Sequence, residues 1–218
     1  MRGDRLVVLD YHRRAAGEIV AHLIPAIRAK TSRYVITVAG ESGSGKSETG
    51  RAIADELEKS AIRSVVLGQD DYFALPPRSN DAKRRADPEW LGPHVEVRLD
   101  VLEQNLIDAT QGADAIAKPL VDYESDTVEA EVVPLEGIQV LIAEGTYTSL
   151  LRHVDTRIFI CRNWLDTLEH RRRRRRGTEV GDPFVEQVLQ TEHKIIAGHR
   201  HLADILITKG YDVNIVDP

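Results

Sequence analysis

The sequence has very little of several residue types, and each shortage narrows the class of protein. Cys161 is the only cysteine among 218 residues, so an internal disulfide is excluded and a reducing compartment is favoured. No apolar run approaches the roughly 18 residues that a membrane-spanning helix needs. The first ten residues also lack the apolar segment of a secretory signal. These shortages predict a cytoplasmic protein without a membrane partner.

Positive charge is also in short supply. The chain has 29 lysines and arginines against 35 aspartates and glutamates, which gives a formal net charge of −6. An acidic balance is unfavourable for a protein that coats nucleic acid, so no nucleic-acid partner is expected. The length is sufficient for one domain with a sizeable core but small for two.

Short apolar runs alternate with amphipathic stretches along the chain. Strands are predicted at 34–39, 64–67, 128–133, 138–143, 157–160 and 205–208, and helices at 10–30, 47–60, 99–109, 164–176 and 183–198. The stretch 75–93 is rich in Pro, Asn, Asp and Arg and is predicted to be a long loop. Alternation of strands and helices favours a doubly wound α/β fold, with a mostly parallel sheet covered by helices on both faces.

One segment has the complete G-x-x-x-x-G-K-[ST] pattern of a phosphate-binding loop, or P-loop, between a predicted strand and a predicted helix. Its residues are Gly40, Glu41, Ser42, Gly43, Ser44, Gly45, Lys46 and Ser47, and the candidate nucleotide-binding set also includes Glu48. The glycines let successive N–H groups point at phosphate oxygens, and the following helix adds its positive end. Lys46 is expected to contact the β- and γ-phosphates, and Ser47 is expected to ligate Mg²⁺.

Three acidic residues follow predicted strands. Asp70 and Asp71 come just after the strand at 64–67, at the edge of an open α/β sheet where ligands bind. On extended backbone two adjacent side chains point in opposite directions, so only one of these acids is expected to face the phosphates. Such an acid accepts a proton from a substrate hydroxyl; capping of a turn is the alternative. Glu144 ends an apolar run and is predicted to support Mg²⁺.

Six arginines occupy residues 171–176. One interpretation is a helical lid that closes over phosphates, and the other is a nucleic-acid-binding patch. Helical spacing places Arg172, Arg173 and Arg176 toward the phosphates, because six consecutive residues cannot share one face. Arg173 is predicted to act with Lys46 in offsetting the charge of the transition state.

The P-loop, the segment Gln69-Asp70-Asp71-Tyr72-Phe73, the pair Glu144-Gly145 and the arginine run occur in an order that resembles the uridine kinase and phosphoribulokinase family, which also includes bacterial-type pantothenate kinase. A further segment, 203–207, resembles the closing strand of this family. The resemblance implies a P-loop kinase fold, ATP and Mg²⁺ as cofactors, and Asp70 as the catalytic base.

The resemblance also indicates where the acceptor differs from uridine. Uridine kinases contact the pyrimidine through a Pro-x-Tyr-Asp-Phe segment and a histidine three residues further on. Here residues 119–123 correspond to that segment, with Val121 in place of the tyrosine and Asp126 in the position of the histidine. Valine offers neither a hydroxyl nor a ring, so uridine is expected to be a poor substrate.

Other residues are candidates for acceptor binding. Tyr72, Tyr123 and Asp87 are assigned to the acceptor, and Glu96 and Asp100 are rivals of Asp87 for holding its hydroxyl groups. Three arginines would suit a phosphorylated or acidic acceptor, if they are more than surface residues: Arg84, Arg85 and Arg98.

The sequence therefore predicts an ATP-dependent kinase that phosphorylates a hydroxyl of a nucleoside, a sugar phosphate or a pantothenate-like acceptor. Residues 1–33 are assigned to an N-terminal helical extension and 34–218 to one kinase domain. The extension either packs on the domain or forms a subunit contact, which leaves a homo-oligomer open. A nucleic-acid-binding ATPase that uses the arginine run is one alternative. A GTPase switch is another, although its guanine-reading motif has one residue too many at 208–212.

Overall fold

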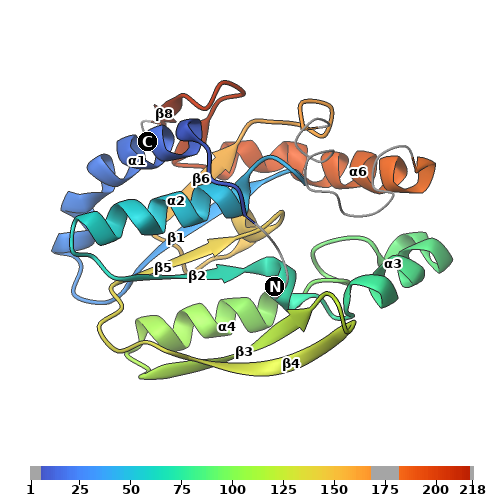
Figure 1. Cartoon of the computed structure of the whole chain (residues 1–218), viewed down its shortest axis with the longest axis horizontal. Helices are drawn as coiled ribbons and strands as arrows, with labels where there is room; N and C mark the ends of the chain where they lie inside the picture. Colours follow the sequence, from blue (N-terminus) through green and yellow to red (C-terminus); the bar gives the residue numbers. More distant parts are fainter. Residues whose placement is uncertain (1–5, 168–181, 217–218) are drawn as a thin grey trace.

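A central sheet with the strand order β2-β5-β1-β6-β7-β8 runs through the computed structural model, which describes residues 6–167 and 182–216 (Figure 1). Its strands are β1 (Tyr34–Gly40), β2 (Ser64–Gly68), β5 (Val140–Glu144), β6 (Thr156–Ile160), β7 (Ile205–Ile207) and β8 (Val213–Ile215). Neighbouring strands are parallel except β7 and β8, which pair antiparallel. The predicted mostly parallel sheet is confirmed.

Helices cover both faces of this sheet (Figure 1). On one face lie α1 (Asp10–Ala29) and α2 (Lys46–Lys59). On the other lie α4 (Leu99–Thr110) and a separate antiparallel hairpin of β3 (Ala115–Asp122) and β4 (Thr127–Pro134). The remaining elements are α3 (Pro77–Ala86), α6 (Pro183–Ile196), and the short 3₁₀ helices η1 (Gln69–Tyr72), η2 (Pro88–Trp90), η3 (Thr148–Leu150) and η4 (Ala197–Leu202).

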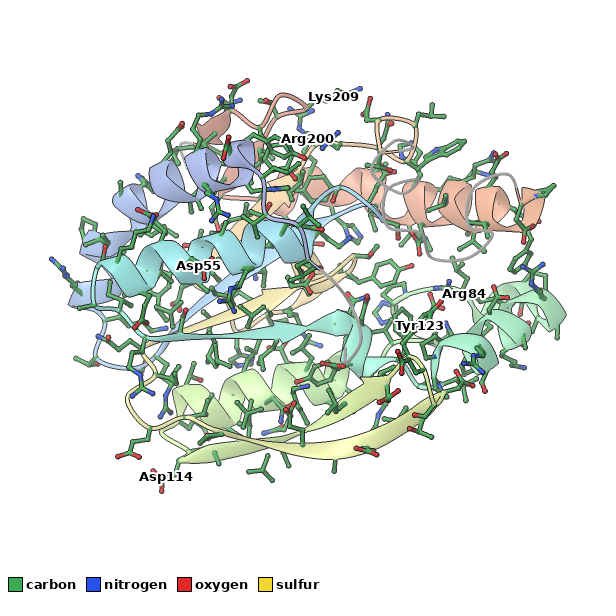
Figure 2. All side chains as sticks on the ribbon, viewed as in Figure 1. Asp55, Arg84, Asp114, Tyr123, Arg200 and Lys209 are labelled. Atoms are coloured by element: carbon green, nitrogen blue, oxygen red, sulfur yellow. The ribbon has the colours of Figure 1, made fainter. Side chains whose placement is uncertain are left out.

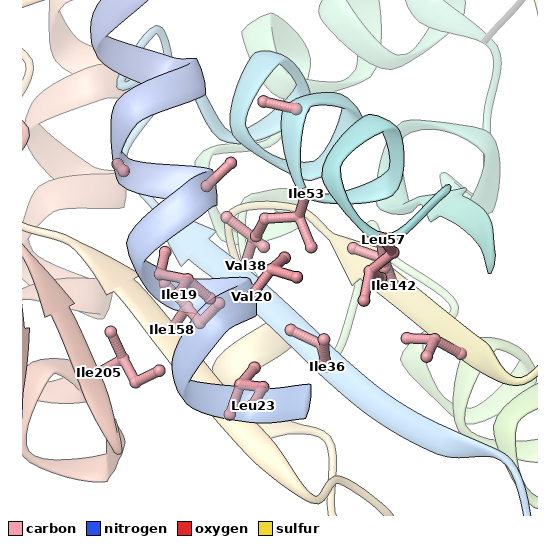
Figure 3. Packing of buried hydrophobic residues seen from close by; sticks show 14 of the residues in the cluster. Ile19, Val20, Leu23, Ile36, Val38, Ile53, Leu57, Ile142, Ile158 and Ile205 are labelled. Atoms are coloured by element: carbon pink, nitrogen blue, oxygen red, sulfur yellow. The ribbon is translucent and has the colours of Figure 1, made fainter. Parts of the chain in front are cut away.

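Strand β1 divides the core into two layers. All seven of its residues are buried, as expected for a central strand covered on both faces. Ile36 and Val38 point into the layer beneath α1 and α2, where Figure 3 shows them beside Ile53 and Ile142. Val35 points into the opposite layer with residues of α4. This alternation fixes β1 in register and thereby the position of the loop that follows it.

Helix α1 is part of the same core. Ala15, Ala16 and Ile19 are fully buried, and Figure 3 shows Ile19, Val20 and Leu23 against the strands. Of the two possibilities left open by the sequence, packing on the domain is what the structure has. The division of the chain at residue 33 stays a prediction.

The predicted loop at 75–93 is wrong, because it contains α3 and η2. The sequence of α3 is almost entirely polar and only Asn80 is buried, so it has no apolar periodicity to reveal it. Its first turn is instead held from a distant segment: Asp126 accepts hydrogen bonds from the Arg78 backbone at 2.7 Å and from the Ser79 hydroxyl at 3.0 Å. Hydrogen bonds from a distant segment therefore stabilise the start of a helix that the local sequence does not predict.

Other differences from the sequence prediction concern short or irregular elements. Strand β3 was not predicted, and it includes Pro119, which an edge strand tolerates. Strand β8 was also missed, since it has only three residues. The predicted helix at 164–176 begins as a turn at 164–167, where Asn163 accepts from two backbone N–H groups, and its remainder lies outside the described residues. Over the parts of the chain that the structure describes, no helix is long and apolar enough to cross a membrane.

Candidate active site

The P-loop connects β1 to α2 and has the backbone shape that its glycines predict. Gly43 and Gly45 have φ angles of +77° and +97°, in the left-handed region that glycine tolerates best. A Cβ atom at Gly45 would also collide with the hydroxyl group of Tyr211, which donates a 2.6 Å hydrogen bond to the Ser44 carbonyl. Glycine is therefore required at this position both by conformation and by space.

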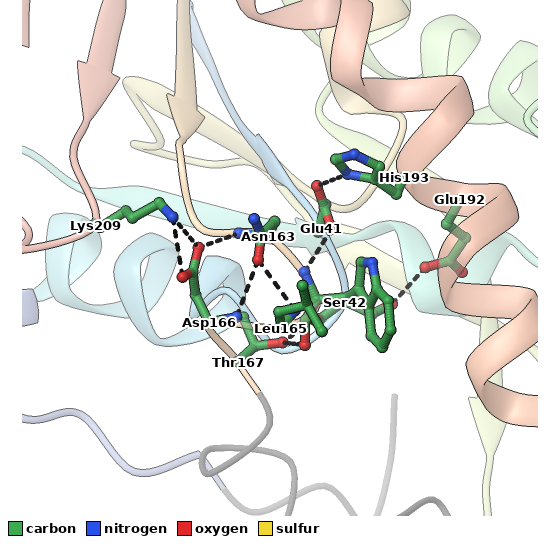
Figure 4. A network of polar contacts seen from close by, with 10 residues as sticks. Glu41, Ser42, Asn163, Leu165, Asp166, Thr167, Glu192, His193 and Lys209 are labelled. Atoms are coloured by element: carbon green, nitrogen blue, oxygen red, sulfur yellow. Dashed lines mark hydrogen bonds and ion pairs between the residues drawn. The ribbon is translucent and has the colours of Figure 1, made fainter.

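Side chains from distant segments hold the P-loop in place (Figure 4). Glu41 is bonded through one oxygen to His193 Nδ1 on α6 at 2.6 Å and accepts the Trp164 N–H on the other at 2.6 Å. The Ser42 hydroxyl donates to Glu192, also on α6, at 2.9 Å. Neither Glu41 nor Glu48, which is buried on the first turn of α2, lines the cavities described below. Glu41 therefore stabilises the P-loop through His193 and Trp164, outside the cavities.

Ser47 and Glu144 meet at the carboxyl edge of the sheet. The Ser47 hydroxyl donates a 3.1 Å hydrogen bond to Glu144 Oε2. Burial, together with the negative charge of Asp70, raises the pKa of Glu144 to about 7, and Lys46 and the Ser47 hydrogen bond partly oppose this. A cation beside these oxygens would relieve the repulsion between the two carboxylates.

This set of oxygens fits Mg²⁺. In the described part of the chain no cluster of three or more His, Cys, Asp or Glu side chains forms a ready-made metal cage. Mg²⁺ is commonly bound by one or two carboxylates and by substrate phosphates, and it keeps several waters. Ser47 and Glu144 would supply the protein's share of such a coordination sphere.

Two adjoining cavities open beside the P-loop. The first, called here the P-loop cavity, has a volume of about 220 Å³. It is lined by Ser42, Gly43, Gly45, Lys46, Ser47, Asp70, Asp81, Arg84, Glu144, Thr146, Val185, Val188, Leu189 and Glu192. The second, the outer cavity, has a volume of about 460 Å³ and is lined by residues of η1, α3, β3 and α6. Asp70 lines both cavities, so it stands where they join.

The two neighbouring aspartates have separate roles in the structure. Asp71 is buried, pairs with Lys118 Nζ at 2.8 Å and accepts the Val121 N–H at 3.1 Å. Asp70 faces the cavities instead. The sequence argument assumed extended backbone here, whereas 69–72 form the 3₁₀ helix η1. The geometric reason was therefore wrong: the helical turn separates the two side chains, and the role of Asp70 toward the phosphates stays a prediction.

Gln69 links the ends of the two strands, β2 and β5, beside which Asp70 and Glu144 lie. Its side-chain oxygen accepts the Tyr147 N–H at 2.7 Å, which joins the segment after β2 to the segment after β5. This hydrogen bond ties together the two segments that carry Asp70 and Glu144. The sequence offered this residue only as part of a recognised segment, without a role.

Only some of the residues predicted to bind the acceptor line a cavity. Tyr123 lines the outer cavity, as does Val121. Tyr72 is fully buried, and its hydroxyl donates to Asn105 at 2.9 Å, so it reaches neither cavity and is corrected to a core residue. Asp87 ends α3, where it accepts the Glu89 N–H and pairs with Lys83, and it too lies outside both cavities.

The rivals of Asp87 are also placed elsewhere. Glu96 is fully buried and binds Asn80 and Arg84, whereas Asp100 is an exposed residue in the first turn of α4. Of the three candidate arginines, Arg84 and Arg85 line the outer cavity, and Arg98 does not.

Sequence reasoning missed several polar residues of the cavities and their surroundings, including Arg78 and Asp182 of the outer cavity. Asp81 and Glu192 line both cavities, and Lys118 anchors Asp71. No local signal marks these three, because each lies in a helix or strand whose position depends on tertiary contacts. The lid residues Arg172, Arg173 and Arg176 fall in the segment 168–181, outside the described residues, and stay predictions.

Comparisons with known proteins agree with this geometry. The family model described as "Phosphoribulokinase / Uridine kinase family" matches residues 35–178. A uridine kinase from Bacillus mycoides is 29% identical over 194 residues, covering 81% of this chain and 85% of its own length. The bifunctional alpha-galactosidase/sucrose kinase AgaSK of Mediterraneibacter gnavus is 27% identical over 189 residues, covering 82% of this chain; the match spans only 20% of that longer protein.

A solved structure supports the fold. The D-glycerate 3-kinase from Cryptococcus neoformans var. grubii superposes with a TM-score of 0.60, covering 94% of this chain and 99% of its own, at 14% identity. At this identity the likeness concerns the fold alone.

Proposed function

Because this chain belongs to the phosphoribulokinase and uridine kinase family and is a small-molecule kinase, we propose that it transfers the γ-phosphoryl group of ATP, in the presence of Mg²⁺, to a hydroxyl group of an acceptor bound in the outer cavity. The observation that carries the proposal is that Asp70 lies where the P-loop cavity adjoins the outer cavity. A carboxylate in this position is within reach of both substrates.

The P-loop side of the site suits the phosphates of a nucleoside triphosphate. The backbone N–H groups of the loop and the N-terminus of α2 offer donors and positive potential to phosphate oxygens. Lys46 Nζ donates to the Glu41 carbonyl at 3.0 Å and lines the same cavity, so it is positioned to meet the β- and γ-phosphates. Mg²⁺ bound by Ser47 and Glu144 would neutralise charge on the transferring group.

The chemistry on the protein side is a proton transfer. The acceptor oxygen forms a bond to the γ-phosphorus while the bond to the bridging oxygen of ADP breaks, and the hydroxyl proton passes to Asp70. Asp70 is suited to this role because Asp71 is already committed to Lys118 and Val121. The remaining contribution is positioning and electrostatic stabilisation.

The lid remains part of this proposal. Arg172, Arg173 and Arg176 are expected to close on the phosphates, whereas Arg171, Arg174 and Arg175 are expected to stay solvated. Single alanine substitutions should therefore lower kcat in the first set and change little in the second. Equal, mild effects in all six, together with loss of polynucleotide binding, would favour the nucleic-acid patch instead.

The experiment that tests the function is an ADP-release assay with Mg-ATP against nucleosides, sugars, sugar phosphates, pantothenate and glycerate. We expect acceptor-dependent ADP release with at least one class, a phosphorylated product by mass spectrometry, and loss of both in Asp70→Asn. Asp55→Asn on α2, which removes an exposed partner of Arg51 away from both cavities, serves as the control. Turnover that does not depend on any added acceptor would contradict the proposal.

A further inference from the structure

The outer cavity is rich in charge, but its charges are of both signs. Its lining contains four carboxylates and three guanidinium groups, from Asp70, Asp81, Asp182, Glu192, Arg78, Arg84 and Arg85. The described lining therefore carries one more negative than positive charge. Burial raises the pKa of Glu192, with Arg84 opposing the shift, and protonation of Glu192 would bring the lining only to balance.

The most buried of these arginines is already neutralised. Arg84 Nε donates to Glu96 Oε2 at 2.7 Å, and its Nη2 lies 3.8 Å from Glu192 Oε1. Glu96 is fully buried and also accepts from Asn80 and from the Gly92 N–H. Arg84 is therefore held by the buried Glu96 and by Glu192 in the cavity lining, and a ligand anion would have to compete with both.

Arg85 is committed in the same way. Its Nε donates to Asp81 at 3.0 Å and its Nη2 to Asp182 at 2.8 Å, so it bridges α3 to the start of α6. The guanidinium also lies over the ring of Phe184, 4.1 Å from the centroid. Arg78 donates to the Glu124 carbonyl at 2.7 Å. Each of the three arginines that line the cavity thus already donates to an acceptor of the protein.

We infer that the acceptor is an uncharged, polyhydroxylated molecule, a sugar or polyol, rather than a phosphorylated or carboxylated one; this rests on the proposed function. Hydroxyl groups can donate to Asp70 and Asp81 and accept from guanidinium N–H groups without disturbing the ion pairs. An anion would lose its hydration beside carboxylates, and each described arginine that lines this cavity already has a protein acceptor. Figure 2 shows Arg84 on α3 and Tyr123 on the hairpin, and both residues line this cavity.

The test compares matched acceptors that differ in one charged group. The pairs are D-fructose with D-fructose 6-phosphate, D-ribulose with D-ribulose 5-phosphate, and glycerol with D-glycerate. ADP release gives kcat/KM for each, and calorimetric titration in the presence of a non-hydrolysable ATP analogue gives the affinity. We expect a neutral member to exceed its anionic partner at least tenfold in one or both measurements.

A substitution that uncovers one arginine sharpens the test. Asp182→Asn removes a carboxylate from Arg85 but retains the N-cap of α6, where the side chain accepts the Phe184 N–H. We expect the ratio of anionic to neutral acceptor activity or affinity to rise about two- to fivefold, the usual range for a partly exposed ion pair. Asp81→Asn removes the other partner and serves as a second variant if the first is poorly folded.

Asp55→Asn is the control, because the Arg51–Asp55 pair has the same i,i+4 spacing as Arg85–Asp81 and a similar separation, 2.9 Å against 3.0 Å. Figure 2 shows Asp55 on α2, far from Arg84. It should leave the ratio unchanged. Tighter binding or faster turnover of the anionic members, or binding of no member of any pair, overturns the inference. Preferred turnover of an anionic acceptor overturns the inference while leaving the proposed function intact, whereas tight binding of neutral members without phosphorylation counts against the proposed function alone.

Discussion

The P-loop cavity and the outer cavity adjoin each other but are built in different ways. The first combines one continuous stretch, from the end of β1 into α2, and acids at the ends of β2 and β5 with side chains of α3 and α6. The second is formed by η1, α3, β3 and α6, which are scattered over more than a hundred residues. Chemistry that depends on backbone shape can be encoded locally, whereas a cavity that fits an acceptor is assembled from distant segments.

The charges of the two cavities differ in the same sense. Lys46 lines the P-loop cavity and is expected to meet phosphate, while Arg84 and Arg85 in the outer cavity are paired with protein acids. A lysine beside a loop of backbone N–H groups suits an anionic nucleotide, and a lining whose arginines already have protein acceptors suits a neutral acceptor. Substitutions at the boundary of the two cavities test this division.

The largest effect is expected for Asp70→Asn, which should lower kcat about 10²- to 10⁴-fold because an amide cannot take the proton. ATP affinity and thermal stability should change little, since Asp70 faces the cavities. Stopped-flow or steady-state kinetics and a melting curve measure both quantities.

Its neighbour provides the control. Asp71→Asn breaks the buried pair with Lys118 and should cost about 3 kcal/mol of the free energy of unfolding, with a smaller loss of kcat. If Asp71→Asn proved the more damaging to kcat in folded protein, the assignment of the two acids would be reversed.

Lys46→Ala should lower kcat about 10²- to 10³-fold, the usual effect of removing one group that stabilises transition-state charge. The fold should persist, because the side chain lines the cavity rather than the core. Kinetics with saturating Mg-ATP and circular dichroism check the two claims. Unchanged turnover in a folded variant would remove the P-loop from the mechanism.

Glu144→Gln should change how stability depends on pH. The pKa of Glu144 in the folded protein is about 7, above its ordinary value of 4.5, so the folded state holds a proton that the unfolded state has lost between these values. Its contribution to stability is thus complete below about pH 4.5 and is lost as the pH rises through 7. Glutamine does not titrate.

The free energy of unfolding of Glu144→Gln, relative to the unmodified protein, should therefore rise between pH 5 and pH 8, by up to about 3 kcal/mol. Urea unfolding in chelator, without nucleotide, measures it. A flat difference across this range would show that Glu144 is not protonated in the free enzyme. Activity should fall in the same variant, because a metal ligand is lost.

The smallest effect concerns the acceptor. Uridine should be used less efficiently than a good neutral sugar, because Val121 cannot meet the base and Asp126 is occupied at the start of α3. An unpaired hydrogen-bonding group on a buried base costs about 1–3 kcal/mol, or roughly 5- to 150-fold in kcat/KM. Competition between uridine and the sugar in one reaction measures the ratio. A kcat/KM for uridine of about 10⁴ M⁻¹s⁻¹ or more would contradict the prediction.

The sequence predicted the elements around the P-loop well and those around the outer cavity poorly. The P-loop, the helix after it, and the strands that end near Asp70 and Glu144 were predicted in place, since each has a local pattern. Helix α3 was predicted as a loop, because its residues are polar and its first turn is held by Asp126 from another segment. Tyr72 was assigned to the acceptor, but it lies in the core, where its hydroxyl group donates to Asn105 on α4.

By itself the sequence determined the family, the P-loop and two of the cavity-facing acids, Asp70 and Glu144, because backbone shape at glycines and the end of a buried strand follow from a few adjacent residues. Only the tertiary structure decided that α1 packs on the sheet, that Asp71 binds Lys118, and that Arg84 and Arg85 are paired with acids. Charge balance in a cavity depends on which side chains meet across the fold, and the separation of two residues along a chain does not give their separation in space.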